Sequence, residues 1–454
     1  MFEMENRGEL VEKIEDLVNR KRYTELRDLL LPLEPADIAI LADDLDDEKT
    51  LPLLFRLLPK EQAAEVFVEL ESDQQELLIR GFSDSELKEV IDELYVDDAV
   101  DIVEEMPANV VQRILTQAEP EMRKQINEIL RYPENSAGSI MTTEYVSLRP
   151  NMTVEEAILR IRRTGIDKET IYTCYVTRGH KLIGLVTVKD LLLCEDDEAT
   201  IESIMQEHVI SVNTLDDQEQ VAQMFSKYNF LALPVVDTEN RLVGIITFDD
   251  AMDVMEDETT EDMEKMAAML PSEHPYMRSS PFEIWKNRIP WLLLLMVSAT
   301  LTGLVITKFE DALGILPCLT AFIPMLMDTG GNAGSQACVS IIRGISLNEI
   351  EFRDLGRVVW KEIRVSVLCG VTLAALNFAK LMLINRVGFG VAAVICLTLI
   401  VTVFAAKLVG CTLPLIAKKA GLDPAVMASP FITTIVDALS LFIYFRMAGT
   451  ILGI

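Results

Sequence analysis

One carboxylate in this chain stands where a charge is costly. Asp437 lies in the middle of an apolar stretch, in the sequence Thr433-Thr-Ile-Val-Asp-Ala-Leu-Ser440. A charge at the centre of a bilayer is strongly destabilising, and an aspartate side chain is too short to reach the headgroups. An internal ion pair with Lys380, Lys407 or Arg446 is one explanation. The other is that this carboxylate binds a cation that crosses the membrane.

A second polar segment interrupts another apolar stretch. Pro317 and Pro324 precede Asp328-Thr-Gly-Gly-Asn-Ala-Gly-Ser-Gln336, where polar and small residues replace apolar ones for more than two helical turns. Such residues are tolerated at membrane depth only against protein or water, and glycines allow helices to approach closely. We expect this segment both to pack against other helices and to line a pore.

Transmembrane helices are the elements that would hold these groups. Crossing about 30 Å of hydrocarbon takes about 20 apolar residues. Such runs lie near 289–307, 313–342, 365–384, 389–416 and 427–453, which predicts a five-helix transmembrane domain over 276–454. Lysines and arginines gather before the first span, between the second and third, and after the fourth. The positive-inside tendency therefore puts the N-terminal part in the cytoplasm and the C-terminus outside.

The rest of the chain is strongly acidic. Residues 1–275 carry 62 of the 72 acids and 26 of the 41 bases, a net charge of −36, whereas residues 276–454 have a net charge of +5. A region this negative repels nucleic acid and anionic lipid, and bound cations would relieve its self-repulsion. The acids are therefore either solvated surface or metal ligands. The first ten residues lack the apolar core of a signal peptide, in keeping with a cytoplasmic location.

The acidic part divides into two kinds of domain and a linker. Over 1–133, short amphipathic patterns such as Lys60–Leu70 and Ser83–Leu94 bury a face only by stacking, which predicts an all-α superhelical domain. Within 134–256, the motif at 181–191 (KLIGLVTVKDL) returns at 241–251 (RLVGIITFDDA), which predicts two copies of one α/β unit. The acid-rich stretch Met252–Leu270 predicts a connecting helix within 252–275, and Pro271 and Pro275 would end it.

The doubled Gly-x-x-Thr-x-x-Asp pattern resembles a tandem CBS domain. Its side chains, Thr187 with Asp190 and Thr247 with Asp250, would either bind the ribose of an adenine nucleotide or only cap helices. The order of acidic helical domain, CBS pair, linker helix and spans is similar to that of the MgtE family of magnesium channels. The most specific pieces are Gly-Gly-Asn-x-Gly-x-Gln at 330–336 and Asp-Pro-Ala at 423–425, followed by Pro430 and Asp437.

The resemblance implies a homodimer in the plasma membrane whose last spans face each other across a pore. Asp437 would then be present twice and hold Mg²⁺ between two carboxylates. Mg²⁺ prefers six oxygen ligands and gives up its waters reluctantly, so the ion would pass hydrated. The resemblance adds Asn332, Ala425 and Thr433 to the pore ligands, and it implies that Asp423, at the cytoplasmic mouth, helps bind an ion that ties the gate to the linker helix.

Regulation by the transported ion is also implied by the resemblance. Mg²⁺ would bridge the N-terminal domain, the CBS pair and the linker helix, and so close the pore when cytoplasmic Mg²⁺ is plentiful. The implied regulatory ligands are Asp217, Asp250, Asp253, Glu258, Glu261, Asp262, Asp97, Asp98 and Asp101. Asn229 stands where relatives can carry a carboxylate, which would weaken one bridging site. If ATP binds the CBS pair, the implied contacts are Tyr172, Lys189, Asp190 and Phe230.

The sequence leaves two other classes of function to consider. A transporter of the same architecture could carry Co²⁺ or Mn²⁺, although no His, Cys or Met stands beside Asp437 to favour a softer ion. An enzyme or a pure sensor is disfavoured because the three histidines lie outside any catalytic pattern and no phosphate-binding P-loop appears. The seven cysteines are scattered without CxxC spacing, so neither a disulfide framework nor a zinc site is indicated.

Overall fold

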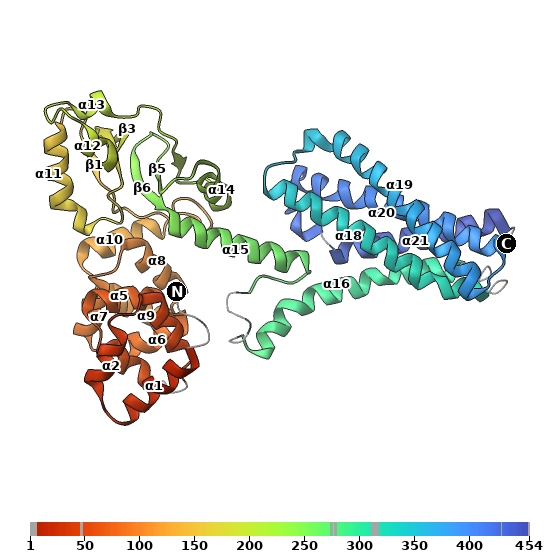
Figure 1. Cartoon of the computed structure of the whole chain (residues 1–454), viewed down its shortest axis with the longest axis horizontal. Coiled ribbons are helices and arrows are strands. Elements are labelled where there is room, and N and C mark those ends of the chain that lie inside the picture. The colour runs from red at the N-terminus through yellow and green to blue at the C-terminus, as the bar shows by residue number, and fades with distance from the viewer. Residues whose placement is uncertain are drawn as a thin grey trace. The chain divides into compact units, whose positions relative to one another are not determined.

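The computed structural model describes residues 7–45, 49–272, 276, 279–309, 317–427 and 429–452. The chain separates into two compact units, Met1–Met255 and Glu256–Ile454 (Figure 1). Pro275 and residues 310–316, which include the start of the second predicted span at 313–316, lie outside the described residues.

Short helices build the N-terminal part of the first unit, so the prediction of an all-α domain made of short amphipathic helices is confirmed. Each buries one apolar stripe; in α7, for example, Leu87, Val90 and Ile91 face the core. The helices are α1 (Arg7–Asn19), α2 (Tyr23–Leu30), α3 (Pro35–Asp43), α4 (Thr50–Phe55), α5 (Lys60–Val68), α6 (Ser72–Gly81), α7 (Asp84–Ile91), α8 (Val96–Glu105), α9 (Ala108–Gln117) and α10 (Pro120–Ile129).

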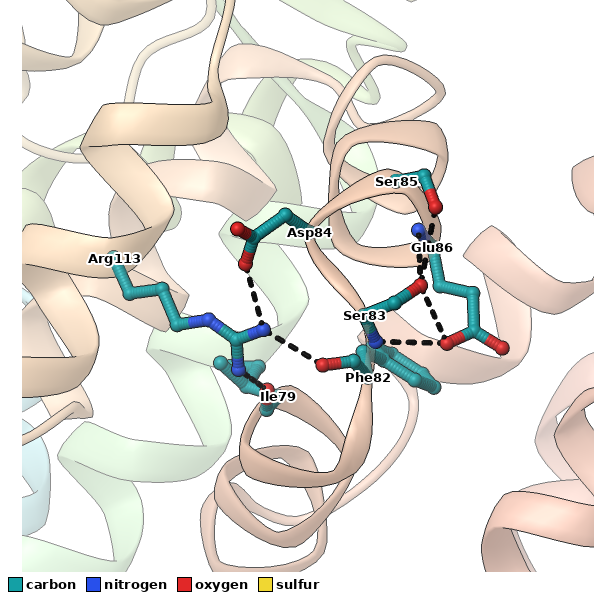
Figure 2. Close-up of polar contacts among 7 residues, drawn as sticks. All are labelled: Ile79, Phe82, Ser83, Asp84, Ser85, Glu86 and Arg113. Carbon is teal, nitrogen blue, oxygen red and sulfur yellow. Dashed lines mark hydrogen bonds and ion pairs between the residues drawn. The ribbon is translucent and has the colours of Figure 1, made fainter.

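Figure 2 shows how polar side chains fix the junction between α6 and α7. Ser83 caps α7: its hydroxyl accepts from the Glu86 amide at 3.3 Å, and the Glu86 carboxylate accepts from the Ser83 amide at 2.8 Å. Arg113 of α9 donates to the carbonyl oxygens of Ile79 and Phe82, the latter at 2.7 Å. These contacts satisfy backbone groups that a helix end leaves unpaired.

Two matching three-stranded sheets follow, and the predicted duplication is confirmed. The sheet orders are β1-β2-β3 and β4-β5-β6, and in each the first pair is parallel and the second antiparallel. The strands are β1 (Ser147–Leu148), β2 (Thr173–Arg178), β3 (Lys181–Thr187), β4 (Val212–Asn213), β5 (Ala232–Val236) and β6 (Leu242–Thr247). The helices are α11 (Val154–Thr164), η2 (Gly165–Asp167), α12 (Val188–Leu193), α13 (Ile201–Ile204) and α14 (Gln218–Tyr228).

Each copy contains a glycine that packs against a methionine of the other copy. A Cβ atom at Gly184, in the first copy, would lie 2.7 Å from the sulfur of Met205, and one at Gly244, in the second, would lie 2.7 Å from the sulfur of Met141. Each methionine therefore packs against the bare glycine backbone of the other sheet. This reciprocal contact interlocks the two copies.

One continuous apolar core joins the N-terminal helices to the second α/β copy. It runs from Ile38 and Phe67 through Val100 to Phe225 and Val254. The first copy has its own smaller core around Val154 and Val186. The N-terminal domain is thus packed onto one of the two copies, and this places α8 beside the loops of the α/β domain.

The linker helix, α15, runs over Phe248–Met266 rather than the expected Met252–Leu270. It begins earlier because Asp250 accepts a hydrogen bond from the Thr247 amide at 3.2 Å, which makes Thr247 and Asp250 the start of the helix. It ends earlier because Ala268 adopts a left-handed conformation (φ 54°) and the Met269 amide donates back to the Glu264 carbonyl at 3.0 Å.

The second unit is built from long helices. They are α16 (Pro281–Lys308), α18 (Ile323–Ser346), α19 (Leu355–Lys380), α20 (Phe389–Lys419) and α21 (Ser429–Leu452), with short turns η3 (Pro317–Phe322), η4 (Phe352–Asp354), η5 (Leu381–Asn385) and η6 (Ala425–Met427). Within the described residues, four helical segments are long and apolar enough to cross a membrane, namely Pro281–Lys308, Phe352–Asn385, Phe389–Lys419 and Ala425–Leu452. The polar run of the second predicted span lies in α18.

Glycines pack α18 tightly against α20 and α21. A Cβ at Gly331 would lie 3.0 Å from the Thr433 methyl, and one at Gly334 would lie 2.9 Å from an Ile432 methyl. A Cβ at Gly410 of α20 would overlap the carbonyl of Gly334. The glycines therefore act as the predicted helix-packing face, because only a bare backbone allows this approach.

Candidate cation sites

Three carboxylates from different elements converge in the first unit. One oxygen each from Asp97, Glu144 and Glu169 lies within 4.8 Å of the other two. Asp97 belongs to α8, Glu144 precedes β1, and Glu169 follows η2. The Val96 amide donates to the Glu144 carboxylate at 3.2 Å, and the Glu169 amide donates to the Glu144 carbonyl at 3.0 Å. Hydrogen bonds along the backbone thus hold these acids beside one another.

Three more acids surround this trio, and we call the set of Asp97, Asp98, Asp101, Glu144, Glu169 and Asp250 the acidic cluster. Burial, and next the nearby Asp250 carboxylate, raise the pKa of Asp98 to about 7 and that of Asp101 to about 8. Burial and the same neighbour raise the pKa of Glu169 to about 8. The raised pKa values show that burial and neighbouring carboxylates make it costly for these groups to ionise together.

The cluster fits a hard divalent cation. Asp97 is buried, with 7 % of its surface exposed, and burial raises its pKa well above the usual range. One oxygen of Glu169 is buried and has no hydrogen-bond partner in the described part of the chain. Carboxylate oxygens are the ligands that Mg²⁺ and Ca²⁺ take, and a bound cation would satisfy that oxygen and offset the repulsion.

The predicted regulatory residues are only partly brought together. The acidic cluster contains Asp97, Asp98, Asp101 and Asp250. Asp253 lies outside it, and its charge, after burial, contributes to a raised pKa of Glu69. Asp217 caps α14 by accepting from the Glu219 amide at 3.0 Å. The sequence did not point to Glu144 or Glu169. Neither belongs to the repeated motif at 181–191 and 241–251 or to a helical face, so only tertiary packing identifies them.

The remaining predicted acids of α15, Glu258, Glu261 and Asp262, belong to the second unit. The Asp262 carboxylate accepts from the Ser346 hydroxyl at 3.3 Å, and burial, together with the charge of Asp423, raises the Asp262 pKa. The Lys265 ammonium lies 2.6 Å from Glu261 and 2.8 Å from Asp423. Lys265 therefore links the end of α15 to Asp423, the residue predicted to lie at the cytoplasmic mouth of the pore.

Asp423 also caps the turn that leads into the last helix. It accepts from the Ala425 amide at 2.8 Å, and Ala425 itself is buried. Ala425 can therefore offer only its backbone carbonyl to an ion.

Asp437 lies on α21, one turn after Thr433. One of its carboxylate oxygens is buried without a hydrogen-bond partner among the described residues, and Asp328 of α18 acts on it electrostatically. Lys407, one of the cations considered as its internal partner, lies 3.6 Å from Glu362 instead. The geometry leaves Asp437 with an unsatisfied oxygen facing protein interior.

A groove between α18 and α19, with α20 behind it, contains the predicted pore residue Asn332. Its volume is about 530 Å³. The polar groups of α18 that line it recur along one face, at Asp328, Asn332 and Gln336. The remaining lining residues are Thr329, Ala333, Leu368, Cys369, Thr372, Leu373, Val403 and Lys407. We call this cavity the interhelical groove.

The candidate nucleotide residues lie at the surface of the α/β domain. Tyr172 and Lys189 are exposed, and Phe230 is half-buried and stacks on Tyr228, with ring centroids 5.3 Å apart. Asp190 accepts from the Thr187 amide at 3.1 Å, so the Thr and Asp of the motif do form a helix cap. Asn229 ends α14 in a left-handed conformation (φ 56°), which asparagine adopts more readily than most residues.

Comparison with known families matches three parts of the chain. Residues 33–135 match the MgtE intracellular N domain, residues 137–195 and 201–257 match CBS domains, and residues 323–447 match the divalent cation transporter family MgtE.

Curated relatives match nearly the full length. The chain is 35% identical over 438 residues to the magnesium transporter MgtE of Thermus thermophilus, covering 94% of this chain and 95% of that protein. It is 32% identical to the magnesium transporter MgtE of Bacillus subtilis, covering 97% of each.

Two solved structures resemble the first part of the chain. One is the cytosolic domain of the Mg²⁺ channel MgtE in complex with ATP, with a TM-score of 0.51 and 36% identity over 54% of this chain and 99% of that one. The other is the soluble part of a magnesium transporter, with a TM-score of 0.51 and 33% identity over 56% of this chain and 99% of that one.

Proposed function

Because this chain belongs to the MgtE family of divalent cation transporters, we propose that it is a Mg²⁺ channel or transporter of the plasma membrane that its own cargo closes. In this proposal the second unit carries the ion and the acidic first unit senses it. The single observation that supports it best is Asp437, a carboxylate in an apolar helix whose buried oxygen has no hydrogen-bond partner among the described residues.

Asp437 is proposed to hold hydrated Mg²⁺. In a homodimer with the last helices face to face, two copies of the carboxylate would neutralise one divalent ion. Thr433, one turn away, and Asn332, in the interhelical groove, offer oxygens to the water shell of the ion. Binding through water avoids the cost of dehydrating Mg²⁺, so the ion can leave again.

The acidic cluster is proposed to be the sensor. With Mg²⁺ bound, α8 of the N-terminal domain would be held against Glu144, Glu169 and Asp250 of the CBS domain. Without it, the buried carboxylates repel one another and the N-terminal domain loosens. The high pKa values of Asp98, Asp101 and Glu169 support this, because burial and neighbouring carboxylates disfavour their negative charge when no cation is bound.

The linker helix is proposed to pass the state of the sensor to the pore. One helix, α15, contains Asp250 of the cluster near its start and Lys265, the partner of Asp423, near its end. A regulatory Mg²⁺ bound by Asp423, Glu261 and Asp262 would take the position that the Lys265 ammonium now occupies. The proposed topology places the N-terminus in the cytoplasm and the C-terminus outside. ATP is a candidate ligand of the CBS pair, because the similar solved cytosolic domain of the Mg²⁺ channel MgtE is in complex with ATP.

Transport by the purified full-length chain tests this proposal. Proteoliposomes that enclose a Mg²⁺-sensitive dye would be assayed with the natural chain, Asp437→Asn and the control Glu349→Gln, which removes an exposed carboxylate outside the helices of the second unit. We expect Asp437→Asn to lose at least about a hundredfold in flux, because two carboxylates each worth about 1.5–3 kcal/mol disappear from one dimeric site. The control should transport normally.

Equal flux in Asp437→Asn and the natural chain would contradict the pore assignment. Repeating the assay with Co²⁺ and Mn²⁺ decides the cargo. We expect Mg²⁺ to move fastest, and faster Co²⁺ or Mn²⁺ flux would favour the softer-ion alternative.

A further inference from the structure

A buried ion pair inside the second unit is not among the proposed ligands of the ion. Lys407 of α20 has 7 % of its side chain exposed, and its ammonium lies 3.6 Å from a carboxylate oxygen of Glu362, a residue of α19 that is 15 % exposed. Lys407 stands 12 residues before the end of α20 at Lys419, or about 18 Å along a helix. A lysine side chain is too short to reach the helix end from there, so the charge stays inside the helical bundle.

Only one member of the pair, Lys407, lines the interhelical groove. Lys407 lines the groove together with Asp328, Asn332 and Gln336, whereas Glu362 is absent from its lining. An ion in the groove would therefore meet the ammonium directly, with the carboxylate behind it. Among the described residues, the Glu362 oxygen nearest Lys407 makes no hydrogen bond, so its interaction with Lys407 is electrostatic and not a fixed hydrogen-bonded geometry.

A positive charge on a cation path raises the energy of every cation that passes it. The repulsion between two like charges is stronger inside a protein than in water, and a carboxylate next to the ammonium cancels much of it. The Asp328 carboxylate, on the facing helix, attracts cations into the same groove. The balance of charge therefore depends on whether Lys407 is neutralised.

We propose that Glu362 is a positioning residue for cation flux: it neutralises Lys407, and without it the Lys407 ammonium blocks cations from the interhelical groove. This inference rests on the proposed function, because it takes the groove to belong to the ion path. Glu362 acts through Lys407 and does not contact the ion. A purely structural role, in which the pair only holds α19 to α20, makes a different prediction for the double variant.

Flux in proteoliposomes tests this with Glu362→Gln and with the double variant Glu362→Gln, Lys407→Met. Removing only the carboxylate should lower Mg²⁺ flux about tenfold, since one uncompensated charge needs to add only about 1.4 kcal/mol to the barrier. Removing both charges should restore flux to within about twofold of the natural chain. Size-exclusion profiles and protein yield monitor folding.

Two results would overturn the inference. Normal flux in Glu362→Gln is one, and a double variant as slow as the single one is the other, because the loss would then come from helix packing. If Glu362→Gln fails to fold, the double variant is compared with the natural chain instead, because it buries no unpaired charge. Equal flux in the two proteins supports the inference, and a tenfold loss of flux in the double variant overturns it.

The Asp437→Asn variant separates this inference from the proposed function. Lost flux in Asp437→Asn with normal flux in Glu362→Gln would leave the pore in place and remove Glu362 from it. Normal flux in Asp437→Asn would instead remove the pore assignment itself.

Discussion

The two candidate cation sites of this chain use the same ligand, the carboxylate, in opposite ways. The acidic cluster gathers six acids from several segments of the first unit, and burial raises the pKa of most of them. The second unit presents Asp437 on a helix bundle that bare glycine backbone packs tightly. A crowded site changes shape when its cation leaves, whereas a sparse site on a rigid frame lets the ion pass. A sensor needs the first property and a pore needs the second.

Gly410→Ala should have the largest effect on this comparison, because it breaks the rigid frame. A Cβ there would overlap the carbonyl of Gly334, so α18 and α20 would have to separate. We expect a cost above about 3 kcal/mol, at the upper end for overpacked sites, and loss of folded protein. The measurement is the yield of monodisperse protein in detergent. Gly356→Ala is the matched control, since nothing lies within 4 Å of its Cβ, and normal yield of Gly410→Ala would refute the packing account.

A pH titration should have the next largest effect, and only on the acidic cluster. Asp98, Asp101 and Glu169 bind protons more tightly in the folded unit than in an unfolded chain, with pKa values of about 7, 8 and 8. Raising the pH from about 5 to about 8 without Mg²⁺ therefore removes protons that the folded state retains, and it should destabilise the packing of α8. Hydrogen exchange of the amides over 96–105, corrected for intrinsic rates, measures this.

We expect protection over 96–105 to fall at least tenfold across that pH range, since a difference of one pKa unit already corresponds to tenfold. Saturating Mg²⁺ should abolish most of the fall, because the cation replaces the protons as the neutralising charge. Protection that is independent of pH, or insensitive to Mg²⁺, would show that these acids are ordinary solvated surface.

Ser83→Ala should have the smallest effect, and it tests local structure away from both sites. It removes the cap of α7 that Figure 2 shows, at a cost of about 1 kcal/mol. Hydrogen exchange over 84–91 should speed up about fivefold for that energy. Ser85→Ala, which leaves the three hydrogen bonds between Ser83 and Glu86 in place, is the control. A change in Mg²⁺ transport by Ser83→Ala would mean that the cap belongs to the regulatory machinery.

Sequence patterns predicted the elements of this fold better than they predicted its sites. The repeat of Lys181–Leu191 at Arg241–Ala251 was enough to predict the two matching sheets, because a duplicated pattern of strand, glycine and helix cap specifies a duplicated unit. The ends of α15 were missed by four residues at each end. The start depended on reading Thr247 and Asp250 as a cap, and the end depended on Ala268 adopting an unfavourable left-handed conformation.

A candidate site residue could be read from the sequence where one residue violates its surroundings, and part of a candidate site was missed where several segments meet. Asp437 was recognisable because a charge in an apolar helix is costly and therefore needs either an internal partner or a function. Glu144 and Glu169 look like any loop acids, and only the packing of α8 against the α/β domain brings them to Asp97. Lys407 was noticed as a cation, but its partner, Glu362, could not be chosen without knowing how α19 and α20 align.

The central claim is tested most directly by measuring single-channel current while the cytoplasmic Mg²⁺ concentration is varied. The claim is that the first unit senses the ion which the second unit carries. Excised patches would compare the natural chain with a variant in which Asp97→Asn, Glu144→Gln and Glu169→Gln are combined in the intact protein. This keeps the shared apolar core, which deletion of the N-terminal helices would expose.

We predict an unchanged unitary current, because Asp437 is untouched, together with a half-inhibiting Mg²⁺ concentration raised at least about tenfold, since loss of metal ligands costs at least as much as loss of their supporting partners. Unchanged inhibition in that variant would contradict the account.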